Sequence, residues 1–217
     1  MSGPDVPAST DSSATEEVRR VLGSEAARVA HLLARVFADD PIERWCLACD
    51  DPAQVLELEF LHVVRQISAE GWLWAIDDLS GVAAWLPPGA GYASDIDDAV
   101  SPLLAAHGGD PDRSARFWDW VDDHRPVSTH WYLDLVAVEP AGRRRGRGRL
   151  LLERGLARLD RLGEPCFLVT GNPVVVPWYQ RHGFTVSSEE EAPEGGPRVW
   201  FMVRGGSAGD RNRRHPP

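Results

Sequence analysis

The chain has 217 residues, of which 43% are hydrophobic and 26% are charged, as is usual for one soluble globular domain. Its 33 acidic residues outnumber its 23 basic residues, and the net charge of −10 argues against a general nucleic-acid binder, which needs a basic face. No apolar run approaches the roughly 18 residues of a membrane span. The N-terminus lacks the basic and apolar regions of a secretory signal, so we expect a cytoplasmic protein without a membrane partner.

Both ends of the sequence are predicted to be tails. Residues 1–15 are rich in Ser, Thr, Pro, Ala and Asp, and residues 205–217 are rich in Gly, Arg and Pro. Neither segment has enough apolar residues to offset the entropy lost on ordering. We therefore expect two disordered tails around one domain that spans residues 16–204.

The first half of this domain is predicted to be mainly helical. Apolar residues recur at helical spacing after Ser24, and Pro41 marks the end of that helix. A second helix is predicted from Asp51-Pro52 to Gly71, where an N-cap and a first-turn proline precede a helical apolar pattern.

Two short strands and two more helices are predicted next. The strands cover residues 72–76 and 81–86 and are joined by the turn-like DDLS. The helices begin at Ser94, with an interruption near Pro102, and at Asp110-Pro111.

The second half of the domain alternates strands and helices. The nearly continuous apolar run of residues 130–138 is typical of a central strand. Further elements are a leucine-rich helix after residue 146, a strand over 166–170, a helix within 176–184 and a strand over 198–203. This order predicts a mixed α/β domain built around one sheet.

The three cysteines do not form a disulfide framework. Cys46 and Cys49 make a C-x-x-C pair, which occurs in zinc sites and redox pairs, but the sequence has no second C-x-x-C pair to complete a zinc site. We therefore expect reduced thiols on or beside a helix, and no metal site.

The loop VEPAGRRRGRGR (138–149) concentrates positive charge in an acidic chain. Gly146 and Gly148 let the backbone approach a ligand closely, and the first N–H groups of the following helix favour an anion. The P-loop and dinucleotide-binding motifs are both absent. The loop is therefore either a polyphosphate cradle or a basic surface turn, which would be solvated or touch RNA.

Three motifs together resemble those of the GNAT superfamily of N-acetyltransferases. The loop after Val138 is similar to its acetyl-CoA motif, GNP (171–173) lies where these enzymes often have an Asn near the cofactor, and WYQRHGF (178–184) is similar to their Y-x-x-x-GF ending. Within the superfamily, the stretch from residue 130 to 204 resembles the bacterial puromycin N-acetyltransferase-type branch. The resemblance implies a central splayed, mostly antiparallel sheet flanked by helices.

The resemblance also implies acetyl-CoA (coenzyme A) as cofactor. It places the pyrophosphate on the backbone of Arg143 to Gly148 and the pantetheine along the edge of the strand that ends at Val138. The N–H of Val136 or Val138 would polarise the thioester carbonyl. The implied cofactor-binding residues are Val136, Ala137, Val138, Arg143, Arg144, Arg145, Gly146, Arg147, Gly148, Arg149 and Asn172. Asn172 is either a pantetheine ligand or a turn-forming residue before Pro173.

Two catalytic residues follow from the same resemblance. Tyr179 matches the tyrosine that protonates the leaving CoA thiolate, with an aromatic packed under the cofactor as the alternative. Asp134 lies in an apolar strand, where strict alternation would place it on one face with Tyr132, Val136 and Val138. It could accept the ammonium proton directly or through water, or bind the cationic amine. Alternatively, it could simply pair with an arginine or reach solvent where the strands splay.

The acceptor site is expected from residues of both halves. Tyr132, Asp40 and Trp45 are the predicted substrate-binding residues. Trp72, Trp74 and Trp85 are candidates for an aromatic wall suited to a planar or cationic ligand, although core packing is the commoner role.

The resemblance implies an acetyl-CoA-dependent N-acetyltransferase acting on a primary amine of a small molecule, and we expect direct attack in a ternary complex. The implied substrate class is an antibiotic or related natural product, in self-resistance or biosynthesis. The alternatives are a protein or peptide N-acetyltransferase and a non-catalytic acyl-CoA-sensing module. We expect a monomer or homodimer without a nucleic-acid partner.

Overall fold

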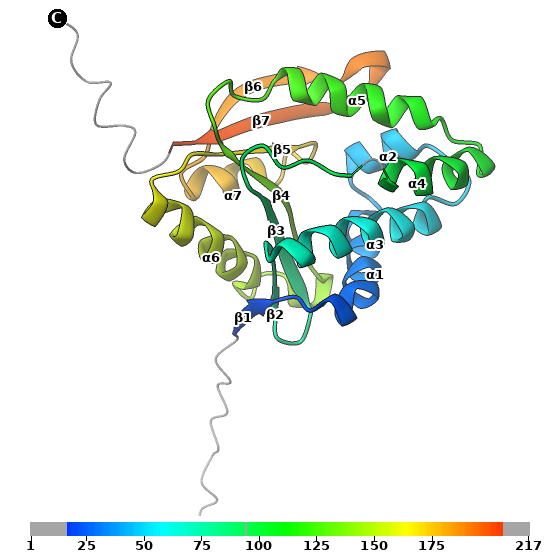
Figure 1. The fold of residues 1–217 in the computed structure, drawn as a ribbon. Coiled ribbons are helices and arrows are strands. Elements are labelled where there is room, and N and C mark those ends of the chain that lie inside the picture. Colours follow the sequence, from blue (N-terminus) through cyan, green and yellow to red (C-terminus); the bar gives the residue numbers. More distant parts are fainter. Residues whose placement is uncertain (1–16, 94, 206–217) are drawn as a thin grey trace, which may run out of the picture.

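A computed structural model describes residues 17–93 and 95–205 (Figure 1). The predicted tails, apart from Gly205, and the predicted helix cap Ser94 lie outside the described residues. Seven strands form one sheet in the order β1-β2-β3-β4-β5-β7-β6, and β4–β5 is its single parallel pair among the described strands. The strands are β1 (Val18–Arg20), β2 (Leu73–Ile76), β3 (Gly81–Leu86), β4 (Trp131–Val138), β5 (Cys166–Thr170), β6 (Thr185–Glu191) and β7 (Arg198–Arg204).

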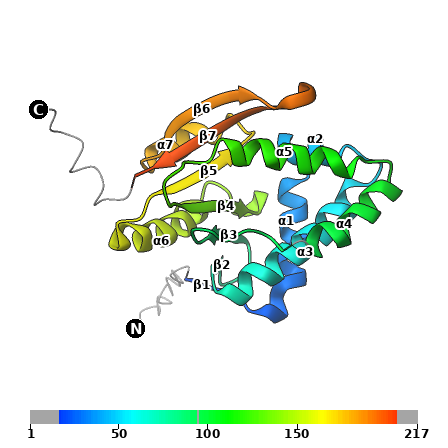
Figure 2. The same ribbon diagram turned by 45° about the horizontal axis from the view of Figure 1, so that its top comes forward.

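Helices cover both faces of the sheet (Figures 1 and 2). On one side lie α1 (Ala26–Phe37), α2 (Pro41–Leu47), α3 (Pro52–Glu70), α4 (Asp95–Ala106) and α5 (Pro111–Asp123); on the other lie α6 (Arg147–Leu162) and α7 (Val176–Arg181). Each side has its own apolar cluster, because alternate residues of the strands point to opposite faces. The predicted mixed α/β fold with a mostly antiparallel sheet is thus confirmed.

Two elements differ from the sequence prediction on the helical side. Pro41 lies past the end of α1 at Phe37, as predicted, but it also opens the unpredicted α2, because the Asp40 carboxylate accepts the Ile42 N–H at 2.9 Å and caps it. Helix α4 was expected to break near Pro102, yet it continues through this proline to Ala106. As the eighth residue of α4, Pro102 removes one backbone hydrogen bond inside the helix, which favours a bend there but does not end the helix.

Strands β1 and β6 were not predicted. β1 has only three residues, and the sequence of β6, TVSSEEE, has low strand propensity. β6 is the edge strand beside β7, and its glutamates are held by Arg198, which contacts Glu189 at 3.1 Å and Glu191 at 3.3 Å. Cross-strand ion pairs, rather than apolar alternation, thus accompany this strand.

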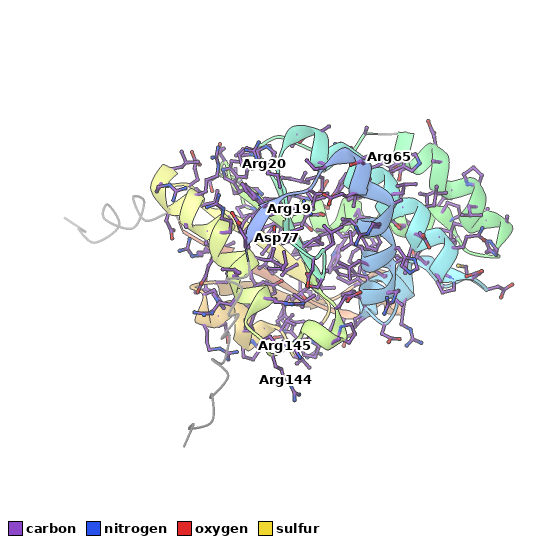
Figure 3. All side chains as sticks on the ribbon, turned by 90° about the horizontal axis from the view of Figure 1, so that it is seen from below. Arg19, Arg20, Arg65, Asp77, Arg144 and Arg145 are labelled. Atoms are coloured by element: carbon purple, nitrogen blue, oxygen red, sulfur yellow. The ribbon has the colours of Figure 1, made fainter. Side chains whose placement is uncertain are left out.

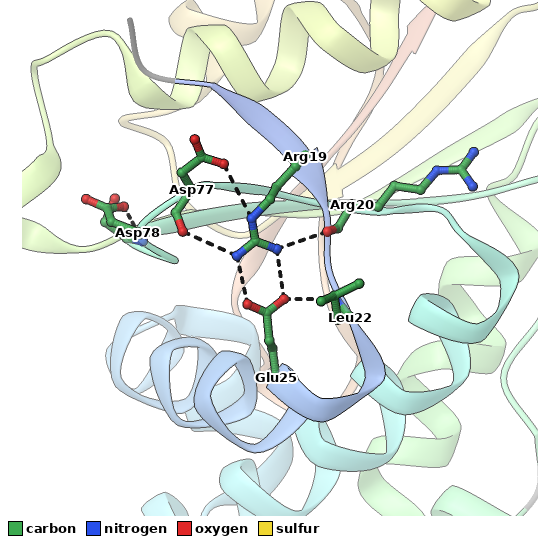
Figure 4. Close-up of polar contacts among 7 residues, drawn as sticks. Arg19, Arg20, Leu22, Glu25, Asp77 and Asp78 are labelled. Atoms are coloured by element: carbon green, nitrogen blue, oxygen red, sulfur yellow. Dashed lines mark hydrogen bonds and ion pairs between the residues drawn. The ribbon is translucent and has the colours of Figure 1, made fainter. Parts of the chain in front are cut away.

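A hydrogen-bonded clamp fixes β1 to the rest of the domain (Figure 4). The Arg19 guanidinium donates to both carboxylate oxygens of Glu25, at 2.7 and 2.8 Å, and to the Asp77 carbonyl at 3.2 Å. Glu25 also accepts the Leu22 N–H at 2.9 Å. These contacts lower the pKa of Glu25 to about 2, so the clamp remains charged in all but strong acid.

The parallel strands β4 and β5 separate soon after they begin. They pair only at Trp131 with Cys166 and at Tyr132 with Phe167, and the rest of each strand diverges from the other. Beyond this point the edge of β4 that faces β5 has no strand partner among the described residues. The splay opens the middle of the sheet to a ligand.

Candidate active site

A cavity of about 580 Å³ fills the splay between β4 and β5. Its walls come from both halves of the chain: α1, α2 and α5 on one side, the arginine loop and α7 on the other. Of the predicted site residues, the cavity is lined by Asp40, Tyr132, Asp134, Val136, Val138, Arg143, Arg144, Gly146, Arg147, Gly148, Arg149, Asn172 and Tyr179. Trp45, Ala137 and Arg145 do not line it.

The arginine loop ends at the N-terminus of α6. Gly146 is the residue before the helix and has φ of +85°, a conformation that glycine adopts without strain. No side chain caps this end, so N–H groups of the first turn remain available, and the macrodipole is positive there. These amides lie beside the open edge of β4 in the same cavity, which fits the pyrophosphate and pantetheine of an acyl-CoA.

The five arginines of the loop lie in different surroundings. Arg147 turns back into the protein, where it hydrogen-bonds the Ser80 hydroxyl and contacts the Asp78 carboxylate at 3.2 Å. Arg143 donates to the Val138 carbonyl at 3.3 Å, and Arg149 lies 3.7 Å from Glu153 on the same helix. Arg147 therefore anchors the loop to the β2–β3 turn.

Arg144 and Arg145 point away from the body of the protein (Figure 3). Both are exposed, but only Arg144 reaches the cavity lining. The five arginines therefore do not all serve one purpose. Arg147 holds the loop in place, while each of the others either lines the cavity or faces solvent.

Hydrogen bonding in β4 turns two backbone donors toward the splay. The Glu139 N–H donates to the Ser80 carbonyl at 2.8 Å, on the side of β3. Because donors alternate between the two sides of an antiparallel strand, the N–H groups of Val136 and Val138 point toward β5. They are the two donors predicted from the sequence. The Ala137 side chain, by contrast, is buried in the apolar cluster on the side of α1 and α3.

Asp134 lies at a β-bulge. Ala84 of β3 pairs with Leu135 and Trp85 pairs with Leu133, so Asp134 is an extra residue in β4. The strict alternation assumed from the sequence is therefore wrong past this point: Tyr132 and Leu135 share one apolar cluster, and Val136 packs on the other side. A bulge re-aims a side chain locally, and here it gives a carboxylate a place in the cavity wall.

Burial dominates the electrostatics of Asp134. It raises the pKa of this carboxyl to about 6, against the opposing effects of the Tyr92 hydroxyl and the positive charge of Arg125. The Arg125 guanidinium also lies 4.4 Å from the ring centroid of Tyr132. Tyr132 is 6% exposed. Asp134 is thus not held in a direct ion pair with an arginine in the described chain.

A side chain of α3 holds the segment that carries Tyr92. The Gln66 amide donates to the Gly91 carbonyl at 2.8 Å and accepts the Ala93 N–H at 3.0 Å. Tyr92 lies between these two contacts, and its hydroxyl is near enough to Asp134 to lower the pKa of that carboxyl. Gln66 thus positions a residue that the sequence did not identify.

Two further carboxyls lie near Asp134. Glu43 of α2 lines the cavity, and its pKa is raised by burial and by the negative charges of Glu59, Asp40 and Asp134. Glu59 of α3 has its pKa raised to about 7 by burial, then by Asp97 and Asp134. The sequence held a signal for Glu59, which sits at helical spacing from the buried Leu56 and Val63, on the apolar stripe of α3.

Tyr179 faces the cavity from α7. Burial raises the pKa of its hydroxyl, and the nearby Asp40 carboxylate raises it further. The phenol therefore stays protonated at neutral pH and can act as a donor. Its ring packs against Trp178 and Phe184, with centroids 4.8 and 5.7 Å away.

Asn172 and Trp45 have visible structural roles. The Asn172 side-chain oxygen accepts the Val174 N–H at 3.0 Å and closes a turn, while the residue also lines the cavity. Trp45 packs against Phe117 with ring centroids 5.9 Å apart, and the Arg113 guanidinium lies over it at 5.6 Å. Trp45 therefore faces α5 and not the predicted substrate.

The cysteines and the predicted tryptophan wall lie apart from this cavity. Cys46 and Cys166 are buried, Cys49 is half-buried, and burial raises the pKa of all three thiols. Within the described residues no group of three His, Cys, Asp or Glu side chains could hold a metal ion. Trp72, Trp74 and Trp85 contact α6 on the other side of the sheet.

Comparison with known proteins finds similarity in part of the sequence and in the fold. Residues 104–186 fit the family model described as acetyltransferase (GNAT) domain. A Corynebacterium glutamicum structure described as histone acetyltransferase HPA2 and related acetyltransferase has a TM-score of 0.68 and 23% identity, covering 88% of this chain and 97% of its own.

Two animal enzymes share the same fold. Arylalkylamine N-acetyltransferase 2 from Aedes aegypti has a TM-score of 0.62 at 13% identity, covering 88% of this chain and 99% of its own. Polyamine N-acetyltransferase from Drosophila melanogaster has a TM-score of 0.58 at 15% identity, covering 87% and 99%. No described helix of the present chain is both long and apolar enough to cross a bilayer.

Proposed function

We propose that this chain, which contains a GNAT acetyltransferase domain and takes the acetyl group from acetyl-CoA, acts on the primary amine of a small cationic molecule. The observation that carries the proposal is the charge distribution of one cavity. Its loop end is lined by arginines and helix N–H groups, while its other end is lined by Asp134, Glu43 and Asp40. An anionic donor and a cationic acceptor are thus accommodated at opposite ends.

The acceptor end favours an amine with more than one positive charge. Burial raises the pKa of Asp134, Glu43 and Glu59, and the charge of Asp134 raises the pKa of both glutamates further, so the three carboxyls share fewer than three negative charges near neutral pH when no cation is present. A bound ammonium group favours the ionised forms of these carboxyls. A diamine, or an amine with a second cationic group, would be stabilised by two of them.

The chain's own residues supply the chemistry in this proposal. Acetyl-CoA provides a thioester whose carbonyl an amine can attack. The N–H of Val136 or Val138 stabilises the oxyanion that develops on that carbonyl, Asp134 accepts the ammonium proton directly or through water, and Tyr179 protonates the departing thiolate. Asn172 and the amides of residues 143–148 hold the cofactor.

The finer substrate class is also part of the proposal. The resemblance of residues 130–204 to the puromycin-type branch favours an antibiotic or related natural product, with a role in self-resistance or biosynthesis. A protein or peptide amine is the second candidate, because a lysine side chain is also a cationic primary amine. The cavity favours the small molecule, since α5 contributes Trp118 to its wall and the Tyr92 hydroxyl is near enough to Asp134 to lower its pKa.

Thiol release from acetyl-CoA, measured over a panel of amines, tests this function. The panel contains a linear diamine, a monoamine of equal length, an arylalkylamine, puromycin and a lysine-containing peptide. We expect the highest kcat/KM among small amines, with the diamine at least about tenfold above the monoamine, as one added charged contact provides. A preference for the peptide would contradict the small-molecule assignment. Tight CoA binding without turnover on any amine would instead indicate a sensor.

A further inference from the structure

A second cavity lies between α6 and strands β2, β3 and β4. Its volume is about 50 Å³, enough for one small polar group. Arg158 in its wall is 11 residues beyond Arg147, or roughly 16 Å along the helix, so the cavity is separate from the acyl-CoA site. Its lining residues are Trp72, Trp74, Trp85, Trp131, Arg154, Gly155, Arg158, Leu159 and Arg161.

Arginines of α6 lie over tryptophan rings on this side of the sheet. The Arg158 guanidinium is 4.6 Å from the ring centroid of Trp72, and the Arg154 guanidinium is 5.0 Å from that of Trp74. Arg20 approaches Trp74 from β1, at 5.4 Å. A guanidinium stacked on a ring uses its face for this contact and keeps its in-plane N–H groups for another partner.

That partner is missing within the described chain. Arg154, Arg158 and Arg161 form no ion pair and no side-chain hydrogen bond with any residue of 17–93 or 95–205. The neighbouring Arg149 and Arg204, by contrast, contact Glu153 and Asp160. A cluster of guanidinium groups without carboxylates, beside an aromatic surface of low dielectric, attracts an anion.

A buried donor in the same cavity also lacks an acceptor. Trp85 is 2% exposed, and its Nε1–H is the one buried side-chain donor of the described residues without a hydrogen-bond partner. Leaving such a group unsatisfied costs about 1–3 kcal/mol. Gly155 allows the indole to lie here, since a Cβ at this position would come within 2.3 Å of Trp85 Nε1.

We propose that this cavity binds an oxyanion, the carboxylate or phosphate group of a small molecule. The in-plane N–H groups of Arg154 and Arg158 and the indole N–H of Trp85 are the donors, and the tryptophan rings accept a flat apolar part of the ligand. In this proposal the tryptophans form an aromatic wall for a planar ligand, one of the two kinds expected from the sequence, but the ligand is an anion and not a cation, because arginines occupy the cation positions. The inference does not depend on the proposed acetyltransferase substrate.

Titration of the full chain, followed through its tryptophan indole N–H signals by NMR, tests the site. The indole N–H signal that is missing from the spectrum of the Trp85→Phe variant is the signal of Trp85. We expect benzoate, inorganic phosphate or both to move it downfield in a saturable way, while the neutral benzamide leaves it in place. The tighter of the two anions identifies the carboxylate or the phosphate as the preferred group.

A matched pair of variants separates the site from general charge effects. Arg158→Gln should weaken binding of the anion by roughly tenfold or more, as loss of a charged hydrogen-bond donor predicts. Arg65→Gln removes one equally exposed arginine from α3 (Figure 3) and should change the Kd less than about twofold. Isothermal titration calorimetry with these two variants serves if Trp85→Phe fails to fold. No saturable shift with either anion, an equal shift with benzamide, or equal weakening in both variants would overturn the proposal.

Discussion

At the scale of single residues, Asp134 determines how activity should depend on pH. Its pKa of about 6 leaves it protonated in mild acid and ionised above neutrality. As a base or an ammonium ligand it must be ionised, so kcat/KM should rise with pH through about 6. Asp134→Asn should lower kcat/KM at pH 7.5 by roughly 10²-fold or more and remove this acidic limb. A variant that keeps the wild-type pH profile would exclude Asp134 from both roles.

Tyr179 permits a second test that separates chemistry from binding. Its raised pKa keeps the hydroxyl protonated, and Phe preserves the ring contacts with Trp178 and Phe184. Tyr179→Phe should reduce kcat by roughly 10²-fold while the Kd for CoA changes less than about threefold. Pre-steady-state thiol release and CoA titration measure the two quantities. Unchanged kcat would leave Tyr179 as a packing residue.

At the scale of elements, α3 supports the acceptor end of the cavity through Gln66. Gln66→Ala removes both hydrogen bonds to the segment around Tyr92, so Tyr92 should leave Asp134 more often. Because the hydroxyl of Tyr92 lowers the pKa of Asp134, that pKa should rise, and the acidic limb of kcat/KM should move to higher pH by several tenths of a unit.

Gln54 of the same helix provides the control for this prediction. Its side chain contacts the exposed His107 at 3.0 Å, away from the cavity, so Gln54→Ala should leave the pH profile in place. An unchanged limb in Gln66→Ala, with normal folding by circular dichroism, would show that Gln66 does not position Tyr92 for this purpose.

An element could be predicted where neighbouring residues in the sequence determine it, and not where pairing with a distant strand determines it. The arginine loop and the following helix were predictable, because the glycines and the leucine stripe are local signals. The bulge at Asp134 was not, since it arises from pairing with β3, and it reverses the faces of Val136 and Val138. Glu43 was missed because α2 was not predicted. In the sequence, a proline that follows one helix looks the same whether or not it opens the next helix, as Pro41 does.

At the scale of the whole molecule, the ionised carboxyls of Asp134, Glu43 and Glu59 should lower the free energy of unfolding at high pH. The pKa of Glu59 rises from 4.5 in the unfolded chain to about 7, so the folded state binds its proton more tightly. This group therefore contributes stability that is complete below pH 4.5 and is lost as pH rises through 7. Glu59→Gln should raise the free energy of unfolding by about 1–2 kcal/mol at pH 8, and Tm by about 3 °C or more, with little change at pH 4.

Glu57→Gln, two residues away on the exposed face of α3, is the matched control. Its carboxylate is 52% exposed and contacts His31 at 3.4 Å, so its stability change should be within about 0.5 kcal/mol at both pH values. Thermal denaturation at pH 4 and pH 8 decides the question. Equal effects of the two substitutions would mean that ionised Glu59 does not destabilise the folded state.

The arginines described above have one more consequence, because all 23 basic residues of the sequence are arginine and none is lysine. A guanidinium remains protonated at every physiological pH and does not attack a thioester, whereas a lysine amine near a bound acetyl donor does. The protein can therefore surround an activated acetyl group with positive charge without offering it an internal ε-amino nucleophile. An incubation with acetyl-CoA alone should leave the mass of every internal tryptic peptide unchanged, and acetyl groups found in the assay will belong to the added amine.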